Sequence, residues 1–269
     1  MNLRKRIFSG RNNNSISGKY RFYKDRIIFG LVIVLLWEFL ARAGFFPELL
    51  FPRASVIGKR FIEMLGGEGL LQSTLYSISI VFYAMLLSLL TVILFVFLTR
   101  RLFFLKNILQ MLNSLLAPLP GIAILPLAIL WLGVNQRAML LIIVHATIWP
   151  LWLQLDLAIE RIEKRFSRFV KAFRLPLPDR VYHLYYQGTK EDLRRALAIS
   201  WSRGWRALIS VEMVFGMVGN KTGLGWLILE RRMYMDTAGL YAGIIAIAFC
   251  GLLFESLIFK KGEKGADEP

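Results

Sequence analysis

The sequence predicts an all-α integral membrane protein with six transmembrane helices. Its 269 residues are 56% hydrophobic, with a mean hydropathy of +0.53, whereas soluble domains are about 45–50% apolar. The excess falls into long blocks, and about 20 apolar residues cross the hydrocarbon core of a bilayer as a helix. The basic residues collect in alternate connections between these blocks, as they do in membrane proteins.

Six apolar blocks carry the predicted helices. They cover residues 27–46, 69–98, 104–133, 138–158, 207–219 and 237–259. The fifth block is too short to cross a bilayer alone. We therefore expect its helix to begin near Leu197, with the side chains of Arg203 and Arg206 reaching the membrane interface.

The third block contains Pro118, Pro120 and Pro126. Proline removes a backbone hydrogen bond and clashes with the preceding turn, so this helix should be kinked or broken. Irregular backbone at membrane depth is tolerated where it faces protein or a water-filled cavity. The third block is therefore the best candidate to line a translocation pathway.

Tryptophans and one carboxylate are further pathway candidates. Trp131, Trp149 and Trp152 either line the path or form an interfacial aromatic belt. Glu212 lies within the fifth block between Val211 and Met213, and ionisable residues inside membrane helices are costly and functional by default. We expect Glu212 to be either a gate in the pathway or the partner of an ion pair or hydrogen bond with a neighbouring helix.

The Lys and Arg residues are divided very unevenly between two sets of segments. The first set holds 26 of them and consists of residues 1–26, 99–106, 159–206 and 260–269, whereas the connections on the other side hold seven. Cytoplasmic segments are the ones enriched in Lys and Arg. This predicts that both termini are cytoplasmic, and it explains the net charge of +16 without a nucleic-acid partner.

The charged stretch 159–206 also contains many apolar residues. Phe166, Phe169, Val170 and Phe173 recur at helical spacing and form one apolar face. Prolines 176 and 178 should then end that helix. We expect a structured cytoplasmic hairpin that buries this face against the membrane domain, against lipid headgroups or against a partner protein.

Small residues repeat through the sixth block. They are Ala238, Gly239, Ala242, Gly243, Ala246 and Cys250. Small residues allow helices to approach closely within lipid. Two interpretations are open at this point, packing within the chain and a contact between two copies, and the first is favoured.

The sequence offers no signature of catalysis. It has no Gly-rich phosphate loop followed by Lys and Ser or Thr, and no nucleophile–base set. Its single cysteine, Cys250, excludes a disulfide within the chain, and His145 and His183 do not have the spacing of metal ligands. We expect no cofactor and no metal, and we interpret both histidines as ordinary packed or surface residues.

Several motifs resemble one family of transport proteins. Residues 118–133, which begin Pro-Leu-Pro-Gly, are similar to the third-helix signature of nitrate/sulfonate/taurine-type permeases of ABC importers. Residues 51–56 resemble the Pro-x-x-x-Val element of that family, residues 205–213 its Trp-to-Glu-Met stretch, and residues 222–228 its Gly-Leu-Gly element. The resemblance extends over about residues 50–259.

The resemblance implies a division of the chain. It places a shared five-helix type I permease core at residues 69–259, with a coupling loop for an ATPase at 159–206. A basic cytoplasmic segment (1–26) and the first transmembrane helix with its polar external connector (27–68) precede this core. A cytoplasmic tail (260–269) follows it.

The resemblance also implies a function and partners. The chain would be the permease subunit of an ATP-driven importer in the bacterial inner membrane, moving a small anionic solute by alternating access. ATP hydrolysis would take place on a separate ABC ATPase subunit, so the chain itself would not be an enzyme. A second permease copy, identical or paralogous, and an extracytoplasmic solute-binding protein would complete the assembly within the lipid bilayer.

Site residues follow from the matching positions. The expected coupling residues are Phe166, Phe169, Ala172, Phe173, Arg174, Pro176 and Pro178. The expected pathway or gate residues are Pro118, Pro120, Pro126, Trp131 and Glu212. Gly223 and Gly225 belong to an external loop.

The coupling loop departs from the family in one respect. The family has a glycine four residues after a conserved alanine, and counting from Ala172 puts Pro176 there, whereas counting back from Trp205 puts Arg174 there. Neither residue supplies the positive φ that glycine allows. We expect a reshaped loop that fits a matched, divergent ATPase, since the apolar face survives; weakened coupling is the alternative.

Within the permease class, the alternative is a divergent subunit that pairs with a different permease. A second class of function is a secondary transporter working alone, which would predict inverted internal repeats, and none is visible in the sequence. A membrane-embedded enzyme would need a cluster of His, Asp or Glu near one face, and the sequence shows none.

Overall fold

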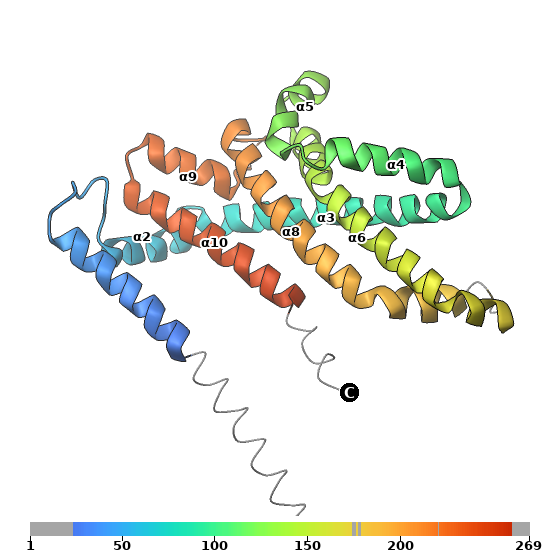
Figure 1. The fold of residues 1–269 in the computed structure, drawn as a ribbon. Helices are drawn as coiled ribbons and strands as arrows, with labels where there is room; N and C mark the ends of the chain where they lie inside the picture. The colour runs from blue at the N-terminus through green and yellow to red at the C-terminus, as the bar shows by residue number, and fades with distance from the viewer. Residues whose placement is uncertain (1–23, 174–175, 177–178, 220, 260–269) are drawn as a thin grey trace, which may run out of the picture.

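The computed structural model describes residues 24–173, 176, 179–219 and 221–259. Helices dominate this part of the chain, with one isolated antiparallel bridge between Val218 and Lys221 (Figure 1). In chain order the elements are a helix over residues 24–42, α2 (Ala54–Gly66), α3 (Leu70–Arg101), α4 (Phe103–Leu116), η1 (Gly121–Ile124), α5 (Leu125–Leu132), α6 (Gln136–Ala172), η2 (Arg180–Tyr186), α8 (Gln187–Phe215), α9 (Leu224–Met233) and α10 (Thr237–Phe259). The predicted all-α class is confirmed.

The central pair is α6 and α8, which lie side by side over most of their length (Figure 1). Asn135 begins α6, because its side chain accepts hydrogen bonds from the backbone N–H groups of Arg137 and Ala138 at 2.8 and 3.1 Å. The helix has 37 residues, or about 55 Å at 1.5 Å per residue. It therefore extends well beyond the roughly 30 Å of a bilayer core.

The helix predicted for the cytoplasmic hairpin is the continuation of α6. It ends at Ala172, before Pro176, as the proline positions predicted. The second arm of the hairpin begins with the π-helix η2, which passes directly into α8.

Helix α8 begins at Gln187 and not near Leu197. Tertiary packing explains this earlier start, because the C-terminal end of α6 gives the charged first turns of α8 a surface to pack on. Thr189 and Ala196 are buried there, and the side chain of Ile162 lies against Gly188. Composition alone could not reveal that packing surface.

The third predicted span is broken, as expected from its prolines. Helix α4 ends at Leu116, and the segment formed by η1 and α5 leaves at an angle of 96°. Pro118 and Pro120 lie in the turn between the two parts, and Pro126 lies in the first turn of α5, where its missing N–H is tolerated.

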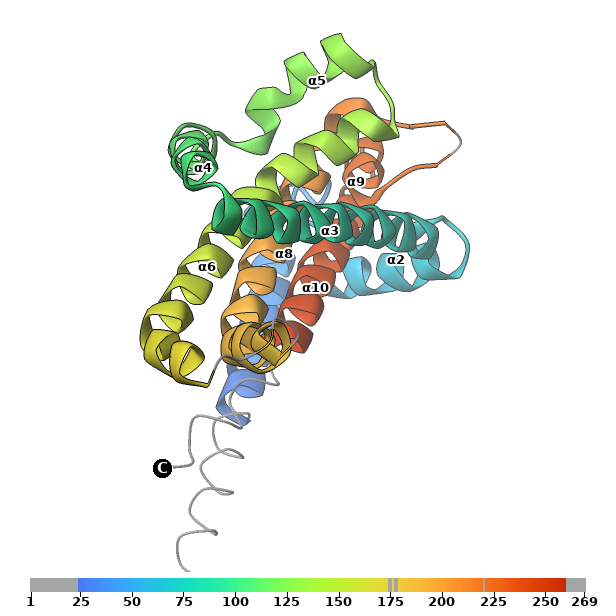
Figure 2. The same ribbon diagram turned by 90° about the vertical axis from the view of Figure 1, so that its right-hand side faces the viewer.

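Helix α3 crosses the other long helices (Figure 2). It contacts α6, α8, α9 and α10. Small residues along its buried side, among them Ser77, Ala84 and Ser88, permit this close crossing. The main buried cluster lies at these crossings.

Trp149 and Trp152 belong to a second buried cluster, between α3, α4, α6 and α8. Trp149 is 8% exposed and Trp152 is 0% exposed. Both expected roles, lining the path and forming an interfacial belt, are therefore wrong for these two residues. They face the interior because α6 packs between several other helices.

Helix α10 contains the small residues of the sixth apolar block. Ala242, Ala246 and Cys250 are buried within the chain, and a side chain at Gly243 would overlap Ile228 of α9. The packing interpretation is confirmed. Glycine and alanine at these positions let α10 lie close to α8 and α9.

The connector predicted at residues 47–68 contains an additional helix, α2, which packs on α10 and buries Ile57 and Met64. The helix over residues 24–42 lies at the edge of the molecule. Trp37 attaches it to the connector by donating a hydrogen bond to the Pro52 carbonyl at 3.0 Å and by stacking on Phe51.

Three of the described helices, α3, α6 and α10, are long and apolar enough to cross a membrane. The bent pair of α4 with η1 and α5 makes a fourth span if it is counted as one broken helix. The other two predicted spans correspond to the helix over 24–42 and to α8, which carry more charged residues. The number six stays a prediction.

Candidate functional site

Glu212 joins three helices. Its side chain on α8 is 1% exposed, and its carboxylate accepts hydrogen bonds from the Ser77 hydroxyl of α3 at 2.7 Å and from the Gly225 N–H of α9 at 2.8 Å. The Ser77 oxygen in turn accepts a hydrogen bond from the Leu224 N–H at 2.9 Å. The carboxylate thus lies at the N-terminus of α9, where free N–H groups and the helix dipole favour an anion.

The glycines of the Gly-Leu-Gly element make room for this carboxylate. A Cβ atom at Gly223 would overlap the Glu212 side chain, and one at Gly225 would overlap the carbonyl oxygen of Ile209. Both glycines are therefore needed for close approach between α9 and α8. Of the two interpretations of Glu212, the hydrogen bond with a neighbouring helix is the one that the structure contains.

Ion pairs connect α2 to the start of α10. The Arg60 guanidinium lies 2.8 Å from the Asp236 carboxylate, and Arg231 of α9 lies 2.9 Å from Glu68. Partial burial raises the pKa of Asp236, but hydrogen bonds from Arg60 and from the Gly239 N–H more than offset it, so that this pKa lies below its ordinary value. The hydrogen bond to Asp236 likewise raises the pKa of Arg60.

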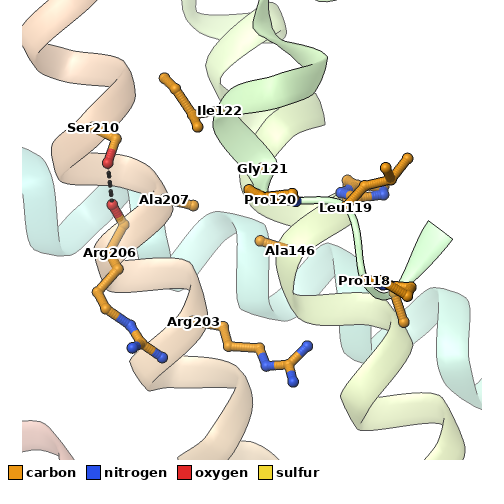
Figure 3. A pocket seen from close by; sticks show the side chains of 12 residues that line it. Pro118, Leu119, Pro120, Gly121, Ile122, Ala146, Arg203, Arg206, Ala207 and Ser210 are labelled. Atoms are coloured by element: carbon orange, nitrogen blue, oxygen red, sulfur yellow. Dashed lines mark hydrogen bonds between the residues drawn. The ribbon is translucent and has the colours of Figure 1, made fainter.

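A cavity of about 430 Å³ opens beside the break in the third predicted span. Its walls are the connection over residues 117–122, His145 and Ala146 of α6, and Arg203, Arg206, Ala207 and Ser210 of α8. Figure 3 shows Pro118 and Pro120 on one side of this space and the two arginines on the other. The structure thus brings two of the predicted pathway prolines together with two cations.

Arg203 and Arg206 lie in the middle of α8, because this helix begins at Gln187. That their side chains reach the membrane interface stays a prediction. Gly204 between them packs against Thr147 of α6 and Val81 of α3, and Val81 lies roughly 17 Å along α3 from its first residue, at 1.5 Å per residue.

The other predicted pathway residues lie elsewhere. Trp131 is 66% exposed near the end of α5, and Pro126 lies at the start of that helix. Neither lines the cavity, and Glu212 lies apart from it at the start of α9. The five candidates therefore do not form a single site in the chain.

The predicted coupling residues lie around the end of α6. The rings of Phe169 and Phe173 lie in contact at a tilt of 41°, with their centroids 4.6 Å apart, and are 48% and 67% exposed. Ala172 and Pro176 are also exposed. Phe166 is half-buried. The remaining two coupling candidates, Arg174 and Pro178, lie outside the described residues.

The sequence of this chain matches the model of a known protein family. Residues 97–259 match the family model described as the binding-protein-dependent transport system inner membrane component. The chain belongs to this family. The match covers the hairpin, the cavity and Glu212 in one permease domain, and it makes the chain a transport permease and not an enzyme.

Named relatives agree with the resemblance to nitrate/sulfonate/taurine-type permeases. The putative aliphatic sulfonates transport permease protein SsuC of Bacillus subtilis (strain 168) is 24% identical over 90% of this chain and 86% of its own length. The taurine transport system permease protein TauC of Escherichia coli (strain K12) is 21% identical over 83% of this chain and 82% of its own. The nitrate import permease protein NrtB of Leptolyngbya laminosa is 22% identical over about half of each chain, 54% and 50%.

Sequence reasoning missed three parts of the permease. It did not identify Ser77 as the partner of Glu212, the pairing of Arg60 with Asp236, or the cavity position of the two α8 arginines. Serines at 73, 77, 79 and 88, within a mainly apolar block, were a signal for a polar contact on α3. The pairing of Arg60 with Asp236 joins residues 176 positions apart, and no spacing rule reveals it.

Proposed function

We propose that this permease is the transmembrane subunit of an ATP-driven importer that moves a small anionic solute across the bacterial inner membrane by alternating access. The observation that carries the proposal is the family match over residues 97–259. The relatives are named for sulfonates, taurine and nitrate, and all of these compounds carry an oxyanion group. ATP hydrolysis takes place on a separate ABC ATPase subunit.

In the proposed topology six segments cross the membrane, and both termini are cytoplasmic. The helix over residues 24–42 and α8 complete the set begun by the four apolar spans. The exposed apolar side chains of the first helix, among them Ile27, Phe29 and Leu35, support its placement in lipid. The 26 basic residues on one side support the orientation.

The end of the α6–α8 hairpin is the proposed surface for the ATPase. It exposes the neighbouring rings of Phe169 and Phe173, as well as Tyr182 and Tyr186 of η2. Exposed aromatic side chains beside basic residues are typical of protein interfaces. Because neither alignment of this loop finds the glycine of the family, we propose that the loop fits a matched, divergent ATPase.

The remaining assembly follows from the family. A second copy of the chain, or a paralogous permease, completes the pathway, and an extracytoplasmic solute-binding protein delivers the solute. The broken span with Pro118, Pro120 and Pro126 borders the pathway, with Trp131 at the far end of this span. Glu212 holds α3, α8 and α9 together at the Gly-Leu-Gly loop, and its release from Ser77 is a candidate gating step.

Co-expression with candidate ABC ATPases tests the proposal. We expect one ATPase to co-purify with the permease, and the double substitution Phe169→Ala/Phe173→Ala to reduce its recovery at least severalfold. The matched control is Phe103→Ala/Phe104→Ala, which removes two phenylalanines that are 77% and 76% exposed from another connection on the proposed cytoplasmic side. This control should leave the recovery unchanged.

Deletion of residues 166–184 gives the second arm of the test. ATP-dependent uptake into proteoliposomes should be lost with the deletion, because the hairpin transmits the movement of the ATPase. If no ATPase binds and the deletion leaves uptake intact, the importer function is wrong, and a transporter that works alone is favoured.

A further inference from the structure

We propose that the cavity beside the broken span is a binding site for a small oxyanion, held by the guanidinium groups of Arg203 and Arg206. The inference rests on the proposed transport function and adds to it a solute site inside the permease itself. Selection of the solute would then occur twice, once in the binding protein and once in the membrane.

The two arginines lie on one face of α8. They are three residues apart, so their side chains are neighbours on the helix surface. In Figure 3 the Arg203 side chain extends from α8 into the space between α8 and α6, below Ala146. Arg206 lines the same cavity, and its Nε donates to the Ser202 carbonyl of its own helix at 3.1 Å.

This pair of cations has no counter-charge in the described part of the chain. No aspartate or glutamate lines the cavity, and neither guanidinium belongs to an ion pair among the described residues. Two like charges at this spacing repel each other. An anion between the two guanidinium groups would relieve that repulsion.

The rest of the wall suits a small ligand. Gly121, Ala146 and Ala207 contribute little side-chain volume, which leaves the space open. His145 belongs to the same wall, but both of its ring nitrogens are buried and the Leu116 carbonyl is close to the ring. A guanidinium is planar and presents paired N–H groups, which match the oxygens of a sulfonate or a nitrate.

Thiol labelling tests the site without requiring transport. The single cysteine permits a Cys250→Ala background, in which Ser210→Cys places one reactive group on the cavity wall. Labelling of the full chain in membrane vesicles uses an anionic methanethiosulfonate that carries a sulfonate group, and a cationic analogue. The ratio of the two rates should fall roughly tenfold or more on Arg203→Gln/Arg206→Gln, because a cleft lined by one sign of charge concentrates counter-ions to about that degree.

Two further variants control for folding and for charge elsewhere. Arg203→Lys/Arg206→Lys keeps the charge and should retain most of the ratio, whereas Arg137→Gln, at the exposed start of α6, should leave it unchanged. Sodium ethanesulfonate should slow the anionic reagent more than sodium chloride does at equal ionic strength. The site is disproved if Arg203→Gln/Arg206→Gln leaves the ratio of the two labelling rates within twofold of the parent value. It is also disproved if ethanesulfonate and chloride slow the anionic reagent equally.

The same variants separate this inference from the proposed importer. If the labelling results hold but ATP does not drive uptake, the anion site stands and the importer function fails. If ATP drives uptake of ethanesulfonate and the glutamine pair alters neither labelling nor uptake, the importer stands and the anion site fails. If the anion site and the importer function are both correct, Arg203→Gln/Arg206→Gln should lower ATP-driven uptake at least tenfold.

Discussion

The carboxylate of Glu212 lies where α3, α8 and α9 meet, and its surroundings explain the residues beside it. Ser77 supplies a hydroxyl donor and the first turn of α9 supplies an N–H group. A buried carboxylate is stabilised only when its oxygens are satisfied in this way. The neighbouring glycines are therefore part of the same arrangement, because any side chain there would displace α9.

Gly225→Ala should destabilise the permease. The added Cβ would overlap the Ile209 carbonyl oxygen and lie 2.7 Å from the Glu212 Cβ, and overpacking of this kind costs about 1–3 kcal/mol. Thermal unfolding of the purified protein in detergent would measure the loss. Gly58→Ala is the matched control, because nothing lies within 4 Å of a Cβ at that helical position. Equal unfolding temperatures for the two variants would show that α9 does not depend on this close approach.

The stability contributed by Asp236 should depend on pH. Its pKa in the folded protein lies below the ordinary value of 3.8, so its ion pairs stabilise the fold above that value and are lost as the pH falls through the folded pKa. Asp236→Asn should therefore lower the unfolding temperature at pH 7, and the difference from the parent should shrink as the pH drops below 3.8.

Glu63→Gln provides the comparison for this titration. The Glu63 side chain also pairs with Arg60, but it is 44% exposed, and such exposed pairs contribute little. Its unfolding temperature should stay close to that of the parent at every pH. A constant gap between Asp236→Asn and the parent from pH 7 to pH 3 would contradict the assigned role of the carboxylate.

At the scale of elements, the contact between α6 and α8 organises the molecule. It extends from the broken span to the hairpin, so that the cavity and the proposed ATPase surface lie on the same two helices. Gly204 lets α8 approach α6, where Thr147 is hydrogen-bonded to Ser88 of α3 at 2.6 Å. We therefore expect a displacement of the hairpin to be transmitted to the cavity through these two helices.

Gly204→Ala should weaken the contact, and Thr147→Ser should restore it. A Cβ at Gly204 would lie 2.7 Å from the Thr147 methyl group, whereas serine lacks that methyl and keeps the hydroxyl. The single substitution at Gly204 should cost about 1–3 kcal/mol, and the double variant should recover most of it. Additive losses in a double-mutant cycle of unfolding free energies would mean that the methyl group is not the obstacle.

At the scale of the whole molecule, charge is arranged at both ends of the helix bundle. Arg60, Glu68, Arg231 and Asp236 form ion pairs at one end, where α2 meets α9 and α10. At the other end Arg100 pairs with the buried Asp156 at 2.9 Å. These clusters connect helices outside the apolar middle, where ion pairs are less costly to form.

The orientation of the whole chain can be tested by reporter fusions. A fluorescent protein joined to the C-terminus should fluoresce, and alkaline phosphatase at the same position should be inactive, because the distribution of the 26 basic residues predicts a cytoplasmic C-terminus. A phosphatase fused after Met235, between α9 and α10, should be active. The reverse pattern would overturn the proposed topology.

Properties that depend on length and composition could be read from the sequence itself. The apolar blocks predicted a helical membrane protein, the prolines at 118 and 120 predicted a broken span, and the motifs at 118–133 and 222–228 indicated the family. Each of these signals is local, because a helix long enough to cross a bilayer and a proline that interrupts it are defined by neighbouring residues.

Contacts between distant segments were decided only by the tertiary structure. The partner of Glu212 lies 135 residues away on α3, Trp152 is buried because α6 packs between other helices, and the start of α8 depends on the surface that α6 offers it. The same packing places Arg203 and Arg206 on the wall of a cavity. Composition shows that a charge is present, but only packing decides whether it faces water, lipid or a binding site.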